Sequence, residues 1–212
     1  MLAGLIYFES NNSNDITYTT LGNTSIGTVE VGISGNVNAT KSIALITGIH
    51  PRETLSIEPE IQAAREYGGD DVKIVNYKVT VTKDPEDYTK GRANGESLVH
   101  DYVNPDIIKS DVDAVIIAHS HIPEYGKGFY VATPAMDNAS VDIAKKINES
   151  LDFNYYPVTG TESYKSTSAV LVSKPIAQAG YPTFVYEVPE DVSESDITGK
   201  TKELFSLIID NL

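Results

Sequence analysis

The 212-residue sequence contains no cysteine, which excludes disulfide bonds, thiolate metal sites and a cysteine nucleophile. Histidine is also scarce, with residues only at positions 50, 100, 119 and 121. Sixteen basic residues stand against 30 acidic ones, so the net charge is −14 and nucleic acids and anionic membranes are poor partners. The charges form no basic run and no acidic tail, which is typical of a solvated surface.

The sequence also lacks a long apolar run. Its first residues, MLAGLIYF, are too few to span a bilayer and have no basic flank like that of a signal peptide. A membrane anchor, if the protein has one, is therefore expected outside this sequence. Glycosylation sequons at Asn11, Asn23, Asn38, Asn138 and Asn148 favour an extracellular or cell-surface protein, and a cytoplasmic location is the alternative.

No internal repeat and no long linker divides the chain, and 41% of its residues are apolar. This length and composition suit one domain with a sizeable core. Polar residues dominate the beginning, so we predict a loosely ordered N-terminal segment over 1–24 and a single catalytic domain over 25–212.

Continuous apolar runs alternate with helical patterns along the domain. Strands are predicted at 26–34, 42–49, 72–82, 112–121, 128–135 and 182–189. Helices are predicted at 58–67, at 138–151 with an Asp137 or Asn138 cap, and at 193–212 with a cap near Ser195 or Asp196. Buried strands interleaved with helices indicate an α/β fold, whose mixed, mostly parallel sheet carries helices on both faces.

Polar residues follow directly after the apolar strand at 42–49. In the stretch GIHPRE, His50 and Glu53 are three residues apart on a bend, where both side chains can turn toward one point. Imidazole nitrogens and carboxylate oxygens are good zinc ligands. A surface loop in which Glu53 begins a helix is the alternative.

A second buried strand ends in histidines, in the stretch IIAHSH. His119 and His121 share a strand face with Val115 and Ile117, so both project to one side of the sheet. Functional groups gather beyond the carboxyl ends of such strands. This strand therefore offers a third metal ligand, unless the two histidines merely cap the core.

Glu187 interrupts the apolar strand TFVYEVPE. A carboxylate there is costly unless it is paired, hydrated in a cleft or protonated. The functional interpretation is a general base beside a metal-activated water. The structural alternative is a glutamate at the exposed strand end or in a salt bridge.

These three stretches, in this order, resemble the zinc carboxypeptidases of the carboxypeptidase A type over roughly residues 25–210. The resemblance implies one Zn²⁺ per chain held by His50, Glu53 and His119, with His119 favoured over His121 because a serine follows it. It also implies that Glu187 is the catalytic base. Tyr164 is similar in position to the family's mobile tyrosine, and a loop tyrosine is the alternative.

The arginines depart from the family pattern. The family uses one arginine to polarise the scissile carbonyl and an Asn-Arg pair to hold the substrate carboxylate, and this chain has no Asn-Arg dipeptide. Arg92, with Asn94 nearby in YTKGRANGE, is the candidate anion clamp, because a guanidinium matches a carboxylate. It is also a candidate to polarise the carbonyl, and an arginine on a glycine-rich surface loop is the alternative. Arg52, within the metal motif, is a candidate for the outer cleft.

The sequence therefore predicts a zinc-dependent amide hydrolase, foremost a metallocarboxypeptidase, with a peptide or N-acyl amino acid as substrate. The first alternative is an N-acyl amino acid deacylase of the succinylglutamate desuccinylase and aspartoacylase type, which shares the zinc motif. Its Asp-Leu-Asn-Arg motif is absent here as well. The second alternative is a non-catalytic binding domain on the same scaffold, which would not need Glu187.

Overall fold

The computed structural model describes residues 16–150, 152–157 and 167–212. The strands in these ranges are β1 (Tyr18–Asn23), β2 (Gly27–Ser34), β3 (Lys41–Thr47), β4 (Val72–Val81), β5 (Ala114–His121), β6 (Tyr130–Ala132), β7 (Asn154–Tyr156) and β8 (Thr183–Pro189). The helices are α1 (Ile57–Tyr67), α2 (Tyr88–Leu98), α3 (Asn104–Ile107), α4 (Asn138–Glu149), α5 (Lys174–Gln178) and α6 (Glu194–Ile209). Two π-helical turns, η1 (Val99–Val103) and η3 (Ala169–Ser173), lead into α3 and α5.

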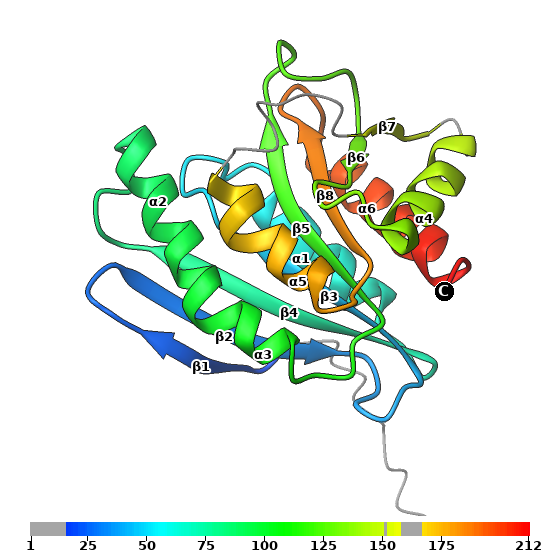
Figure 1. Ribbon diagram of the computed structural model, residues 1–212, viewed down its shortest axis with the longest axis horizontal. Coiled ribbons are helices and arrows are strands. Elements are labelled where there is room, and N and C mark those ends of the chain that lie inside the picture. Colours follow the sequence, from blue (N-terminus) through cyan, green and yellow to red (C-terminus); the bar gives the residue numbers. More distant parts are fainter. Residues whose placement is uncertain (1–15, 151, 158–166) are drawn as a thin grey trace, which may run out of the picture.

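The strands form one sheet in the order β1-β2-β4-β3-β5-β8-β6-β7 (Figure 1). The central pairings β4–β3, β3–β5 and β5–β8 are parallel, and so is the outer pair β6–β7. The pairings β1–β2, β2–β4 and β6–β8 are antiparallel. The predicted α/β class with a mixed, mostly parallel sheet is confirmed.

Helices cover both faces of this sheet, and in Figure 1 α2 and α5 lie in front of it while α1 lies behind. On one face, residues such as Leu45, Ile116 and Phe184 pack with α1, α4 and α6. On the other, residues such as Ile46 and Ile117 pack with α2, η1, α3, η3 and α5. All eight residues of β5 are buried, which explains why its first five residues are apolar without alternation.

Several helix boundaries match the sequence, and others correct it. Asp137 caps α4, where its side chain accepts a hydrogen bond from the Ser140 amide at 2.9 Å. The cap expected at Ser195 or Asp196 is wrong: Ser193 caps α6 by accepting from the Asp196 amide at 3.1 Å. Ser193 also donates its hydroxyl to the Asp196 carboxylate, so the two residues stabilise the first turn together.

The N-terminal segment and α2 differ from the sequence-based expectation. Residues Tyr18–Asn23, which the sequence places in a loosely ordered segment, form β1 and pair with β2. The glycine-rich stretch around Arg92 is helical and not a loop, because Asp87 caps it by accepting from the Thr89 and Lys90 amides. None of the helices in the described ranges is long and apolar enough to cross a membrane.

Candidate metal centre and active-site cleft

His50 and Glu53 lie on a tight bend that follows β3. The bend begins at Gly48, whose φ of 77° is left-handed and whose added Cβ would lie 2.2 Å from the Val79 carbonyl oxygen. It closes when the Glu53 amide donates to the His50 carbonyl at 3.0 Å. The two side chains of the His-x-x-Glu motif therefore point to the same place.

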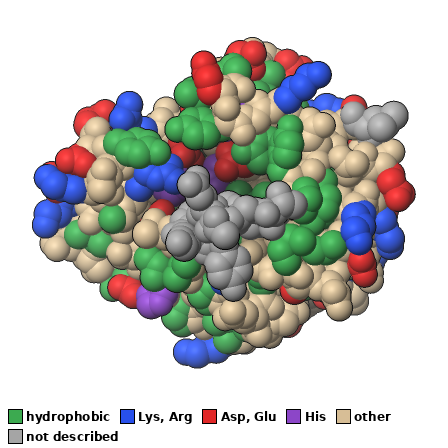
Figure 2. Space-filling view, turned by 45° about the horizontal axis from the view of Figure 1, so that its top comes forward, with side chains coloured by type: hydrophobic (Ala, Val, Ile, Leu, Met, Phe, Trp, Pro, Cys, Tyr) green, Lys and Arg blue, Asp and Glu red, His purple; other side chains and the backbone are tan. Residues whose placement is uncertain are grey.

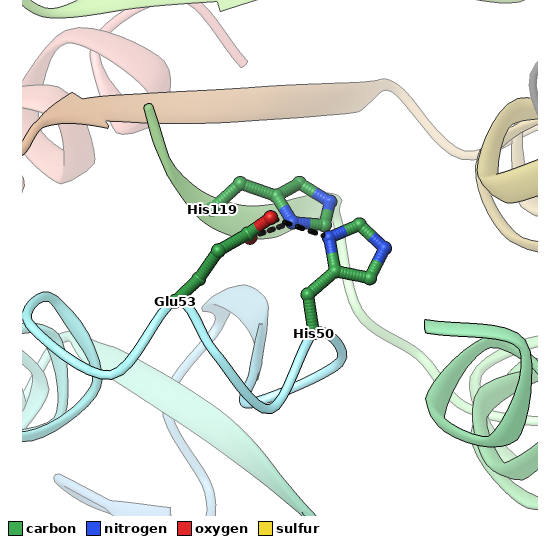
Figure 3. Close-up of side chains that lie close together, drawn as sticks. All are labelled: His50, Glu53 and His119. Carbon is green, nitrogen blue, oxygen red and sulfur yellow. Dashed lines mark hydrogen bonds and ion pairs between the residues drawn. The ribbon is translucent and has the colours of Figure 1, made fainter. Parts of the chain in front are cut away.

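His119 reaches that place from the end of β5, as Figure 3 shows. The Glu53 carboxylate lies between the two imidazoles, with one oxygen 2.8 Å from His50 Nδ1 and the other 2.8 Å from His119 Nδ1. The histidine rings stack with centroids 4.3 Å apart. Potential ligand atoms of all three residues lie within 4.8 Å of one another, so His50, Glu53 and His119 form a group that could hold a metal ion.

The donor set fits the zinc that the resemblance implies. Two imidazole nitrogens and one carboxylate are a ligand set of catalytic zinc sites, which need three protein ligands. Both histidines are buried, and Glu53 is partly exposed toward the cleft. Burial pushes the Glu53 pKa upward, but the positive charge and hydrogen bonding of His119 and His50 outweigh it and hold the pKa below its usual range. Glu53 is therefore ionised, as a metal ligand must be.

Glu96 on α2 lies behind His50. Its Oε1 is 3.5 Å from His50 Nε2, and neither atom has a hydrogen-bond partner among the described residues. Burial lowers the His50 pKa, and contacts with Glu53 and Glu96 more than offset that effect and raise it. α2 approaches this closely because Gly95 has no side chain: a Cβ there would lie 1.7 Å from the Ile49 carbonyl oxygen.

Glu187 lies beside His119, because the two residues are paired across the parallel strands β5 and β8. Its side chain faces the cleft. Protein surrounds most of the carboxyl, and this burial raises the Glu187 pKa to about 7. Nearby His119 and Arg92 oppose the rise, and Glu53 adds to it. In the described residues Glu187 is not in the group of potential ligand atoms.

Arg92 on α2 extends to the metal group. Its Nη1 lies 3.0 Å from Glu53 Oε1, and about a third of its side chain is exposed. The guanidinium carbon is 5.3 Å from the centre of the Tyr88 ring, and that of Arg52 is 6.0 Å from the same ring. Both guanidiniums therefore lie against the same Tyr88 ring on one wall of the cleft.

The remaining candidate residues have different places. Asn94 does not line the cleft; its side-chain amide donates to the Lys83 carbonyl at 2.8 Å, so its role in substrate binding stays a prediction without a contact to support it. His121 is oriented away from the metal group, with its ring nitrogens 3.0 Å from the carbonyl oxygens of Ile122 and Gly128. Tyr164 lies outside the described residues.

The metal group, Glu187 and Arg92 line a cleft of about 520 Å³ at the carboxyl ends of β3, β5 and β8. Figure 2 shows a hollow with histidine and acidic side chains inside it, Lys or Arg side chains on one side and apolar side chains on the other. Tyr88, Ile122, Tyr125 and Tyr130 contribute apolar surface to the cleft lining. An apolar lining with a few converging polar groups is typical of a ligand site.

Sequence reasoning missed Glu96, Glu60 and Tyr130. Glu60 is buried within α1, and neither of its carboxylate oxygens has a hydrogen-bond partner among the described residues. Burial raises its pKa well above the usual range, and the charges of Glu53 and Glu187 add to that rise while Ser56 opposes it. No local signal in the sequence shows that packing buries Glu96 and Glu60.

Comparisons with known proteins agree with this geometry at the level of the fold. No family model and no curated protein matches the chain. A metallo-carboxypeptidase from Burkholderia cenocepacia is similar with a TM-score of 0.64 at 15% identity, over 92% of this chain and 65% of that one. A metallo-carboxypeptidase from Pseudomonas aeruginosa, in complex with (2-guanidinoethylmercapto)succinic acid, has a TM-score of 0.54 at 12% identity, over 89% and 64% of the two chains.

A third similar structure is the product-bound Cell Shape Determinant protein Csd4 from Helicobacter pylori, with a TM-score of 0.55 at 10% identity over 93% of this chain and 55% of that one. The chain thus spans less than two thirds of each of these proteins. At such low identity the likeness concerns the fold. The chain has the fold of the two metallo-carboxypeptidases and of Csd4, as its resemblance to the zinc carboxypeptidases predicts.

Proposed function

We propose that the protein is a zinc-dependent hydrolase of amide bonds, and foremost a metallocarboxypeptidase. The observation that carries this proposal is the convergence of His50, Glu53 and His119 at the cleft, with Glu187 beside His119. A non-catalytic domain would have no need for a carboxylate next to an open metal position. Zinc held there would polarise the scissile carbonyl and lower the pKa of water.

The chain's own residues complete the chemistry. Glu187 takes the proton of the attacking water and passes it to the leaving amine, since it lies in the cleft and is not one of the three ligands. Arg92 lies next to the ligand Glu53, so its guanidinium is in reach of a substrate carboxylate or of the developing oxyanion. Arg52, on the same wall, extends this positive surface outward.

The substrate is a peptide or an N-acyl amino acid. The neighbouring Csd4 structures were solved with a product and with a tripeptide bound, and the Pseudomonas enzyme with a succinic acid derivative. These ligands favour a carboxylate-bearing substrate for the present cleft as well. No Asn-Arg dipeptide exists in the chain, so the proposed anion site is Arg92, with Arg52 beside it on the cleft wall.

The experiment is turnover by the zinc-loaded protein of two substrate classes, blocked dipeptides and N-acyl amino acids. We expect hydrolysis of a blocked dipeptide that a chelator abolishes and added zinc restores. Hydrolysis of the N-acyl amino acid alone would make the protein a deacylase. A protein that binds zinc and both substrates but hydrolyses neither would be the binding domain instead.

A further inference from the structure

A carboxylate is fixed on the wall of the cleft at the end of β8. Glu190 directly follows β8, and its backbone amide donates to the His121 carbonyl at 3.0 Å. Its Oε1 accepts a hydrogen bond from the Ser120 hydroxyl, also at 3.0 Å. Glu190 and Ser120 both line the cleft. The carboxylate is therefore held to β5 by its backbone and by its side chain, while the residue as a whole is exposed.

Glu190 differs from Glu53 and Asp87, two other acidic residues of the cleft, in what it contacts. The remaining one, Glu187, is largely enclosed by protein and is the proposed base. Glu53 is engaged by two histidines and Arg92. Asp87 caps α2 and pairs with Lys90. Glu190 forms no ion pair with any described residue, and the single hydrogen bond from Ser120 leaves most of its acceptor capacity free.

The opposite wall of the cleft has the opposite charge. Arg52 follows β3, Glu190 follows β8, and β5 with His119 lies between these two strands in the sheet. Arg92 reinforces the positive wall beside Tyr88. The order across the cleft is therefore guanidiniums, metal group and free carboxylate, and this order would align a substrate that carries charges of both signs.

We propose that Glu190, oriented by Ser120, forms a subsite for an ammonium group of the substrate next to the scissile amide. This inference rests on the proposed function and specifies its substrate class: a short peptide or acyl amino acid with a carboxylate and an ammonium. A carboxylate and an ammonium form a charge-assisted hydrogen bond, which is stronger than one between neutral groups. Ile122 and Tyr125, which follow β5 and line the same cleft, offer apolar surface to an aliphatic stem.

An ammonium can come from a lysine-type side chain or from a free α-amine, and matched substrate pairs separate these sources. The first pair is benzoyl-glycyl-lysine and its ε-acetyl form, and the second is acetyl-lysyl-alanine and its ε-acetyl form. The third is alanyl-alanine and its N-acetyl form. For the zinc-loaded wild type, we expect kcat/KM to favour the ammonium member of one pair by at least roughly tenfold, as a hydrogen bond to a charged group provides.

Glu190→Gln should abolish that preference by lowering kcat/KM for the ammonium member far more than for the acetylated member. Glu190→Asp should retain part of it. The control is Glu124→Gln, since Glu124 is exposed on the neighbouring loop and does not line the cleft. This control should keep the wild-type preference. Equal kcat/KM within all three pairs, with neutral substrates still hydrolysed, would overturn the subsite and leave the proposed function intact.

If no member of any pair is hydrolysed, the proposed function fails, and the same pairs then test the subsite by calorimetric binding to the zinc-loaded protein. Tighter binding of an ammonium member, lost in Glu190→Gln, supports the subsite. Equal dissociation constants within every pair overturn it.

Discussion

The Glu96 carboxyl lies 3.5 Å from Nε2 of His50, on the opposite side of the ring from the contact between Nδ1 and Glu53. Glu96 has only about 2% of its side chain exposed, so water offers no substitute partner. An imidazole that binds metal through one nitrogen commonly donates its other N–H to a carboxylate, which fixes the tautomer and the ring orientation. Glu96 is in the position to do this for His50.

Glu96→Gln should therefore weaken metal binding by roughly 10- to 100-fold, the range found when such an outer partner is lost. The amide keeps the size of the side chain but supplies no negative charge to the His50 N–H. Zinc affinity is measured by competition with a chromophoric chelator. Glu149→Gln is the control, because Glu149 is exposed at the end of α4. Unchanged affinity in the Glu96 variant would make this carboxyl a packing residue.

The choice of the third ligand is tested by two histidine substitutions. His119→Ala should lose bound zinc, because it removes one of three ligands of a group whose atoms lie within 4.8 Å. His121→Ala should retain zinc, since the His121 nitrogens contact the carbonyls of Ile122 and Gly128. Metal content per chain after dialysis decides between them, and a reversed pattern would show that His121 is the ligand.

Glu187→Gln separates a base from a ligand. It should cut turnover by at least roughly 100-fold, the lower end for general acid–base catalysis. Zinc content should stay close to one per chain, because three other residues supply the ligands. Both quantities are measured on one preparation. Near-normal turnover removes Glu187 from the reaction, and loss of zinc makes it a ligand.

Two substitutions test whether the positive charge and the planar shape of the Arg92 guanidinium matter for turnover. Arg92→Ala should lower kcat/KM by roughly 100-fold, which is the effect of removing one donor to a developing oxyanion. Arg92→Lys should recover only part of that loss, because an ammonium cannot form the planar fork of a guanidinium. Arg65→Ala is the control, since Arg65 lies on α1 outside the cleft. Full activity of Arg92→Ala would contradict both roles.

Glu60 should make the stability of the protein depend on pH. Its pKa in the folded state is raised by burial, so the folded state keeps this proton where the unfolded state, with a pKa of about 4.3, releases it. The stability contributed by the protonated form is complete below that unfolded pKa and is lost as pH rises. This loss has a slope of up to about 1.4 kcal/mol per pH unit.

Glu60→Gln removes this titration while keeping the side-chain volume. Urea unfolding of the metal-free protein at pH 5 and pH 8 should show the variant gaining stability relative to wild type as pH rises. Glu149→Gln should show a constant difference between the same two pH values. A constant difference for Glu60→Gln as well would mean that Glu60 does not keep its proton in the folded state.

The sequence by itself determined the class of the sheet and six of the eight strands that the described residues form, and it marked the residues of the candidate metal group. Strands buried on both faces must be apolar throughout, so His50, which follows 42–49, and the histidines that end 112–121 stand out against their neighbours. Parallel strands place their carboxyl ends at one edge, so local sequence predicts that His50, Glu53, the histidines of the second strand and Glu187 gather there. The choice of His119 came from the resemblance to the zinc carboxypeptidases.

Only the tertiary structure decided what surrounds that group. Strand parity sends His119 and His121 to the same side, and the structure distinguishes them. His119 contacts Glu53, whereas His121 contacts the carbonyls of Ile122 and Gly128. Arg92 and Glu96 belong to a glycine-rich stretch with weak helix propensity. The stretch needs glycine at position 95 because the Ile49 carbonyl lies against it in the folded protein. Such contacts join residues far apart in the chain, so no local pattern encodes them. Packing of α2 against the bend after β3 places the side chains of Arg92 and Glu96 at the metal group.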